Sequence, residues 1–449
     1  PSDVRQQRLC DFRQGTTVFL FTVDVLSEGV DIPDINLVMF LRPTESLTVF
    51  LQQLGRGLRH APGKDCLTVL DFVGQTHRRY RLDRKFSALL TDGRMRLDKE
   101  VEQDFPSLPA GCNIQLERVA RDEVLRKIRA VLDDLNSFIP ETIRTWESES
   151  DQPLRFGSFI EETGLQAAEV LRKKTWSEWK AVAFRESRPS DADISVGRKA
   201  LSRIALRTDP VLLQAISKMQ HREAGTGIDD ARVGVALHYL LWGRTGTEVG
   251  VASVNESIGK WSANPTLVSD AAEIADWQLS RASTVMPEVQ LPSGHRLRLH
   301  AEYGSAEIKS LLDLATIDAS GSTGVGAFHS RENKFYVNLV TFQKEEKDFS
   351  PTTRYEDYPI SRTKLHWQSQ SGTSQDSERG KGYIHFKERG YAVLFFARLK
   401  KRVGRETSPF VFLGPVSELL SYEGDRPISM VWELEYPMPA HLFEHARPA

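Results

Sequence analysis

The length, composition and charge of the chain predict a folded protein with several domains. It has 449 residues, 40% of them hydrophobic, and a chain of this length divides into two to four domains with cores of their own. Lys and Arg together number 59 against 61 for Asp and Glu, which excludes a bulk cationic field that would draw in nucleic acid. Any nucleic-acid binding must therefore come from local basic patches.

Cysteine content and hydropathy exclude further classes of protein. Three scattered cysteines, Cys10, Cys66 and Cys112, exclude a disulfide framework and a zinc site with paired ligands. The sequence contains no apolar run of membrane-spanning length and no signal segment. We expect a cytoplasmic protein without a membrane partner. Because the first residue is Pro1 rather than Met, we also expect the chain to be part of a longer protein.

Residues 1–100 alternate strand-like and helical patterns. Apolar runs at 18–23, 37–41 and 67–73 are typical of strands, and a helical pattern covers 46–59. This alternation predicts a parallel α/β sheet. The few strands expected over residues 1–100 predict only part of such a domain.

The remaining sequence predicts a helical region over 101–286 and a β-rich domain over 287–449. Helical periodicity, as in Val124, Ile128 and Val131, indicates a bundle or connector. After about residue 287 the apolar runs become short and rich in aromatic and β-branched residues, which favours a barrel or sandwich. The polar stretch 368–381 is predicted to be a mobile loop. The expected strands lie at 335–342, 382–386, 391–396, 410–413 and 428–434.

The first motif that carries chemistry is Thr22 to Pro33, with the sequence TVDVLSEGVDIP. It follows a predicted strand directly, so the Thr22 hydroxyl and backbone N–H groups near Gly29 can hold a phosphate oxygen. Asp31 is placed to orient a ribose or an arginine. The structural alternative is an ordinary strand-to-helix turn in which Gly29 only permits unusual backbone angles.

The second motif, QQLGRGLR, runs from Gln52 to Arg59 on the predicted helix. At about 100° per residue, Gln52, Arg56 and Arg59 share one stripe beside the apolar face that contains Leu54. A guanidinium suits this position because its charged, planar fork stabilises a transferring phosphoryl group. The alternative is a pair of solvated surface arginines.

These two motifs resemble motifs V and VI of the second RecA-like lobe of superfamily-two helicases. The resemblance covers about the first 75 residues. It implies that Arg56 and Arg59 lie at the γ-phosphate of ATP, with Arg59 as the arginine finger. It also implies that Gly29, Asp31 and Gln52 contact the nucleotide, and that Thr22 contacts the nucleic-acid backbone. The cofactors implied are ATP and Mg²⁺.

The sequence departs from the helicase pattern in one important respect. It has neither the phosphate-binding loop (GxxxxGK[ST]) nor the acidic magnesium-binding box of the first lobe, and these hold most of the ATP and Mg²⁺. We therefore expect this chain to be part of an ATP-hydrolysing helicase but inactive alone. The expected partner is an upstream first lobe.

The later sequence resembles the tail of one group of bacterial superfamily-two helicases, long called a domain of unknown function. In that group the helicase often follows a phospholipase-D-like nuclease domain, and the resemblance implies a role in DNA restriction, repair or phage defence. The segments that carry it are Asp104 to Cys112, Ser350 to Tyr358, Leu365 to Gln370 and Phe412 to Pro415.

Two segments of the β-rich domain are candidates for nucleic-acid contact. Trp367 offers a stacking surface among His366, Gln368 and Gln370, whose polar groups are able to bond base edges; the alternative is a strand in which Trp367 packs inward. The basic run Lys400, Lys401 and Arg402 is suited to a phosphate backbone, although such runs are often solvated loops.

One catalytic hypothesis is set aside. His385 and Lys387 have the spacing of a phospholipase-D half-site, but the acidic or amide residue and a second copy are missing, so this segment is assigned to a strand. We predict no metal site.

Three functions remain, the third of which is a regulatory or partner-docking tail. The first is the C-terminal part of an ATP-dependent DNA helicase or translocase, with RNA not excluded as the substrate. The alternative is a non-catalytic module that reads nucleic acid, including modified bases, beside a degenerate helicase lobe. The presence of both Arg56 and Arg59 favours the first, because a scaffold needs neither.

Overall fold

The structure is a computed structural model, and its elements fall into two compact units. One unit comprises residues 1–90 with 114–130, and the other residues 91–113 with 131–449. The residues described are 2–21, 33–41, 54, 61, 64–71, 97–105, 108, 113–118, 120–122, 124–126, 134–149, 153–163, 165–186, 194–221, 230–281, 286–291, 293–321, 326–344, 357–403 and 406–446.

The first unit contains the predicted parallel pair of strands. β1 (Leu37–Phe40) and β2 (Thr68–Asp71) run parallel, with Leu37 opposite Thr68, and α1 covers Ser2–Arg13. Parallel strands need a crossover connection, which agrees with the predicted helix between them. Residues 18–21, the described part of the first predicted strand, lie outside this pair.

The second unit begins with helices, as the periodicity predicts. Local sequence fixes their ends: Thr175 and Glu178 form a reciprocal capping box at the start of α9, and Gly243 ends α12 in the left-handed conformation. These helices are α4 (Leu97–Glu102), α6 (Leu135–Glu149), α7 (Phe156–Thr163), α8 (Ala167–Lys173), α9 (Trp176–Phe184), α10 (Ile194–Ile204), α11 (Pro210–Ser217), the 3₁₀ turn η1 (Lys218–His221), α12 (Ala231–Trp242), α13 (Gly246–Val249), α14 (Val254–Ser262) and α15 (Pro265–Arg281).

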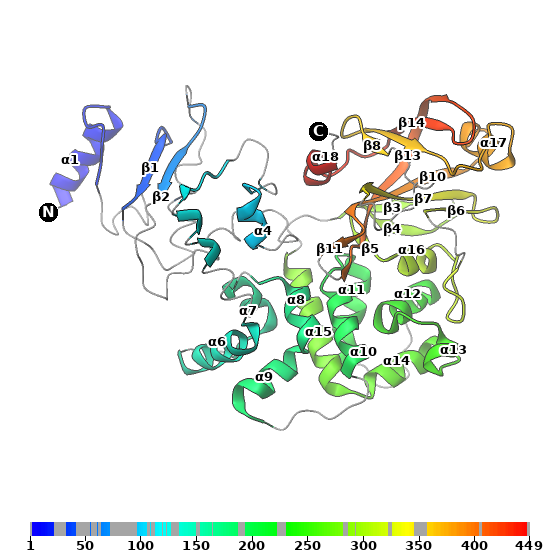
Figure 1. Ribbon diagram of the computed structural model, residues 1–449, viewed down its shortest axis with the longest axis horizontal. Coiled ribbons are helices and arrows are strands. Elements are labelled where there is room, and N and C mark those ends of the chain that lie inside the picture. The colour runs from blue at the N-terminus through cyan, green and yellow to red at the C-terminus, as the bar shows by residue number, and fades with distance from the viewer. Residues whose placement is uncertain are drawn as a thin grey trace. The chain divides into compact units, whose positions relative to one another are not determined.

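After residue 286 the described part of the same unit is mainly strands, with three short helices among them. Figure 1 shows the helices α8 to α16 gathered on one side of these strands. The elements are β3 (Glu288–Gln290), β4 (Arg296–Arg298), β5 (Glu302–Tyr303), α16 (Ser305–Leu311), β6 (Ala327–Ser330), β7 (Phe335–Gln343), β8 (Tyr358–Pro359), β9 (Lys364–Gln368), α17 (Glu378–Ile384), β10 (Ala392–Lys400), β11 (Arg402–Val403), β12 (Glu406–Thr407), β13 (Phe410–Glu423), β14 (Ser429–Leu434) and α18 (Ala440–Ala446).

Eight of these strands form one mixed sheet. Its order is β6-β7-β10-β13-β14-β9-β8, with β5 also paired to β13. β7 and β10 run parallel and the other pairs are antiparallel. No pairing joins β6 to β8 among the described residues, so the sheet is open. The predicted β-rich domain is present, but its barrel or sandwich form is not confirmed.

The sheet separates two hydrophobic cores. Along β10, Leu394 and Phe396 face the core shared with the helices, whereas Val393 and Phe395 face a second core. The pairing of β13 with β10 and with β14 contains register shifts. Near the first of them Gly414 has φ +90°, and a Cβ there would lie 2.9 Å from the ring of Tyr436. Residues of β14 and β9 contribute to the second core.

Buried polar contacts also join the helical region to the strands. Arg207, after α10, forms a bidentate ion pair with Glu307 of α16 at 2.6 and 2.9 Å, with both side chains at least 95% buried. Asp209, the N-cap of α11, accepts a hydrogen bond from the Tyr303 hydroxyl of β5. The predicted boundary between residues 286 and 287 separates helices from strands, yet both sides share one core. The predicted domain limits stay predictions.

The structure corrects two predictions around residue 380. Residues 382–386 were expected to be a strand, but Glu378–Ile384 form helix α17, capped by the Ser377 hydroxyl. Gly382 is needed there because a Cβ would lie 1.8 Å from the Tyr336 hydroxyl. The segment 368–381, expected to be a loop, contains turns held by hydrogen bonds, such as that from Gln375 N to Asp425, and its last four residues belong to α17.

Candidate nucleic-acid interface

Six residues assigned to the motor motifs lie outside the described residues, so their roles stay predictions. Their described neighbour, Leu54, is helical and buried against Phe40 of β1. This contact agrees with the predicted apolar face of the helix, beside which the stripe of arginines was placed. The six residues are Thr22, Gly29, Asp31, Gln52, Arg56 and Arg59.

Trp367 packs inside the second core. Its side chain is 4% exposed, and its ring lies 5.1 Å from the ring of Tyr383 and 5.8 Å from that of Phe395, both in edge-on arrangements. The structure thus supports the inward-packing alternative rather than the stacking surface. Trp367 is therefore not available to stack on a base, because aromatic side chains occupy the space that a base would need.

The polar neighbours of Trp367 lie on the opposite, outer face of β9. Side chains alternate along a strand, so His366 and Gln368 are half-buried while Leu365 and Trp367 are fully buried. The His366 ring stacks on Tyr358 of β8 at 4.5 Å and 16°. The Gln368 side-chain amide donates to the Ser429 hydroxyl of β14 at 3.2 Å. This face therefore offers stacked rings beside an amide.

The basic run begins where β10 ends. Lys400 is the last residue of β10, and Arg402 starts the short β11–β12 hairpin. Both side chains are exposed, whereas Lys401 is half-buried. Just before the run, Arg398 lies 4.0 Å from the centre of the Phe410 ring and donates to the Thr341 hydroxyl and to the Ser408 carbonyl. Arg398 thus fixes the strand end from which the run projects.

A short chain of contacts connects the basic run with the outer face of β9. Lys400 is paired with Gln343 of β7, and the next residue, Lys344, forms a buried ion pair with Asp357 at 2.7 Å. The second carboxylate oxygen of Asp357 accepts the backbone N–H of Gln368 at 3.1 Å. The structure therefore brings the two segments to one region of the sheet.

Sequence reasoning missed Asp357 and Tyr358 as members of this interface. Both belong to a segment that was used for the family resemblance, but nothing in the sequence shows that β8 pairs with β9. His385 ends α17 and lies 3.1 Å from Glu388, so its assignment to a strand was wrong. No group of three or more metal-ligating side chains occurs among the described residues.

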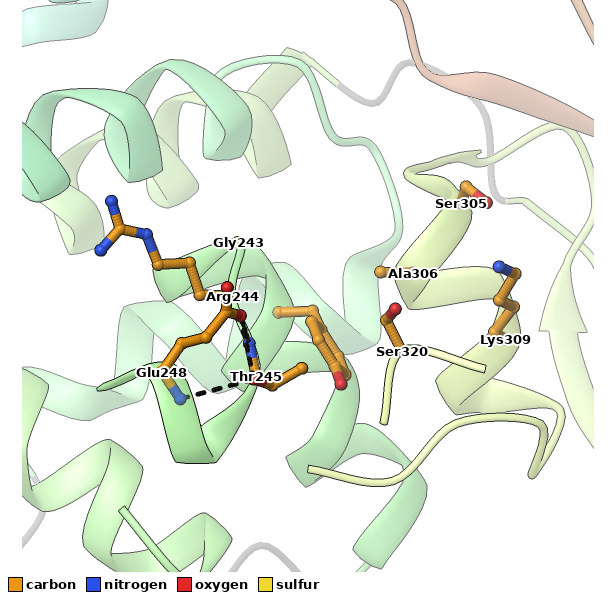
Figure 2. Close-up of a pocket in the computed structure, with 9 residues that line it drawn as sticks. Gly243, Arg244, Thr245, Glu248, Ser305, Ala306, Lys309 and Ser320 are labelled. Atoms are coloured by element: carbon orange, nitrogen blue, oxygen red, sulfur yellow. Dashed lines mark hydrogen bonds between the residues drawn. The ribbon is translucent and has the colours of Figure 1, made fainter. Parts of the chain in front are cut away.

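A pocket of about 330 Å³ lies apart from this interface, between the α12–α13 turn and α16. It contains Lys309, whose pKa is lowered by burial, and the exposed Arg244. Figure 2 shows the Arg244 guanidinium pointing away from Lys309 and Ser320. The two cations therefore do not converge on one ligand. Among the described residues, no helix is both long and apolar enough to cross a membrane.

Comparison with protein-family models identifies both ends of the chain. Residues 1–61 match the helicase conserved C-terminal domain, and residues 297–446 match a domain of unknown function, DUF3427. The predicted order, a helicase C-terminal lobe followed by that tail domain, is confirmed. The second match begins in β4 and ends in α18, so it contains the mixed sheet but not the segment Asp104 to Cys112.

Two curated proteins are similar to short stretches of the chain. A "51.5 kDa protein" of a Lactococcus phage is 39% identical over 77 residues, which are 17% of this chain and 17% of that protein. The "Putative ATP-dependent helicase IRC3" of Saccharomyces cerevisiae is 38% identical over 63 residues, 14% of this chain and 9% of that protein. The chain therefore matches less than a fifth of either relative.

Proposed function

We propose that this chain is the C-terminal part of an ATP-dependent DNA helicase or translocase, working in the bacterial cytoplasm in DNA restriction, repair or phage defence. The observation that carries the proposal is the match of residues 1–61 to the helicase C-terminal domain, which contains both arginines of the second motif. The similarity to a protein named as an ATP-dependent helicase supports it.

In this function the two ends of the chain have different roles. Arg56 and Arg59 stabilise charge on the γ-phosphate during hydrolysis, while Gly29, Asp31 and Gln52 position the nucleotide. Most contacts to ATP and Mg²⁺ come from the first lobe. Thr22 contacts the DNA backbone, and the sheet domain holds the DNA through Lys400, Lys401 and Arg402. An upstream phospholipase-D-like domain would supply a nuclease activity.

The motor role is tested by ATP turnover in the chain joined to its first lobe. The isolated chain should show no DNA-stimulated ATPase activity, and the joined protein should be active. Arg59→Ala should lower kcat by about 10³-fold or more with little change in nucleotide affinity, and Arg59→Lys should rescue poorly because an ammonium lacks the fork. Arg8→Ala, which removes an exposed arginine of α1, is the matched control. Near-normal turnover in Arg59→Ala would sink the arginine-finger assignment.

The second candidate function, a non-catalytic module that reads DNA, is favoured by one observation. The Tyr358–His366 stack and the Gln368 amide share an outer face of the sheet that is connected to the basic run. Such a face is suited to contacting a base while the run holds the phosphates. The two candidates differ in turnover: a reader would bind DNA with the same affinity whether or not ATP is hydrolysed.

DNA binding by the sheet domain is tested with the whole chain. Changing Lys400, Lys401 and Arg402 to Gln should weaken binding of every sequence and flatten its dependence on salt. Arg172, Lys199 and Lys218, three exposed cations of the helical region, are changed to Gln as the control for net charge. Equal affinities of the two triple variants would refute the assignment of the basic run.

A further inference from the structure

A cluster of arginines and aromatic rings lies where β6, β7 and β10 meet α17. We call it the arginine–aromatic cluster; none of its members was singled out by the sequence motifs. Its members are His329, Arg331, Tyr336, Arg379, Arg389 and Tyr391.

The aromatic part is built by strand pairing. His329 of β6 is directly opposite Tyr336 of β7, and their rings stack at 5.6 Å and 19°. Tyr391, just before β10, lies 5.1 Å from Tyr336. Tyr336 itself is buried, whereas His329 and Tyr391 are half-buried. The cluster therefore has two partly exposed rings beside a buried aromatic ring.

Arg379 is held in place rather than freely solvated. Its guanidinium donates to the Gln370 side-chain carbonyl, and Gln370 in turn donates to the backbone carbonyl of Ala327 in β6. A second guanidinium nitrogen lies 3.4 Å from Nδ1 of His329. Because a guanidinium has five N–H donors, it retains donors for a further acceptor.

Three arginines, Arg331, Arg379 and Arg389, lie near these rings. Burial, together with the charges of Arg379 and Arg331, lowers the pKa of His329, which favours the neutral ring. Burial raises the pKa of the Tyr336 hydroxyl, and the positive charges of Arg389 and Arg379 oppose this rise. Glu378 reaches Arg389 at 3.4 Å, but it is 79% exposed, and such ion pairs contribute little.

We propose that the arginine–aromatic cluster binds the phosphodiester backbone of a nucleic-acid strand, with a neighbouring base or sugar against Tyr391. Arginine forks suit phosphate oxygens, and aromatic rings suit bases of any sequence. The choice of nucleic acid over free phosphate rests on the proposed function. The cluster would be a second contact region, built from residues other than the basic run that follows β10.

The test measures binding of labelled single-stranded and duplex DNA to the whole chain over a range of salt concentrations. Arg331→Gln combined with Arg389→Gln should weaken binding by about ten-fold or more and reduce the salt slope by about 1.5 to 2, which is roughly 0.7 to 0.9 for each lost phosphate contact. Arg331→Lys combined with Arg389→Lys should restore most of the slope. The control removes Arg296 and Arg426, which are 63% and 68% exposed and lie in other hairpins. Melting temperatures verify that each variant is folded.

The outcomes separate this proposal from the function on which it rests. If the double Gln variant binds DNA like wild type while the basic-run variant binds weakly, the arginine–aromatic cluster is not a DNA-binding site. The proposed DNA-binding role of the chain then still stands. If wild type binds no DNA, the role fails, and inorganic phosphate becomes the probe. A melting temperature that phosphate raises in wild type but not in the double Gln variant would then assign the cluster to free phosphate. If phosphate did not change the melting temperature of wild type, the proposal that the cluster binds phosphate groups would fail as well.

Discussion

Replacing Trp367 with alanine should destabilise the protein rather than remove a DNA contact. The side chain is 4% exposed and touches the rings of Tyr383 and Phe395. A buried aromatic side chain removes about 150–250 Å² from water, which at about 25 cal/mol per Å² amounts to about 4–6 kcal/mol. Alanine keeps part of this burial but leaves a cavity, so we expect a loss of about 3–5 kcal/mol.

The measurement is urea unfolding of the whole chain, followed by far-ultraviolet circular dichroism, with DNA binding measured only where the variant is folded. His366→Ala is the matched control: it changes the adjacent residue on the opposite face of β9 and should cost less than about 1 kcal/mol. Trp367→Phe, which keeps an aromatic ring in the core, should fall between the two. A Trp367→Ala protein as stable as wild type that no longer binds DNA would refute the core assignment and restore the stacking role.

Two further predictions concern buried charges. Burial raises the pKa of the Asp270 carboxyl from 3.8 to about 6. Because the folded protein favours the protonated carboxyl, this group contributes fully to the free energy of unfolding below its unfolded pKa. That contribution is lost as the pH rises through the folded pKa. Relative to wild type, the free energy of unfolding of Asp270→Asn should therefore rise by about 3 kcal/mol between about pH 4 and pH 7. If urea melts gave a difference in stability between the two proteins that does not change with pH, this prediction would be contradicted. Glu307→Gln leaves the buried Arg207 guanidinium without its counter-charge and should cost about 3 kcal/mol in thermal or urea melts. Replacing both residues with Met should recover most of that loss, and an unchanged single variant would disprove the importance of the ion pair.

Local patterns in the sequence were sufficient for much of the fold. The parallel pair β1 and β2, the run of helices and the strands β7, β10 and β14 lie close to where the apolar periodicity predicts them, whereas β13 begins as predicted but continues to Glu423. Each depends on residues close together in the chain. The helicase motifs were likewise recognisable because their residues are contiguous, and the family match confirms that identification.

Other features depend on contacts between distant segments, so they could not be predicted. The period of two along β9 separates Trp367 from His366 and Gln368, but only packing against distant residues such as Tyr383 and Phe395 decides which face becomes the core. The aromatic and β-branched residues near the end of α17 favoured a strand, and its glycines gave no sign of a helix. The close approach of Tyr336 to Gly382 requires a glycine there, and the contact of Arg379 with His329 spans 50 residues. Alternation is a local property of the backbone, whereas the choice of buried face and of charge partners depends on packing between segments that folding alone brings together.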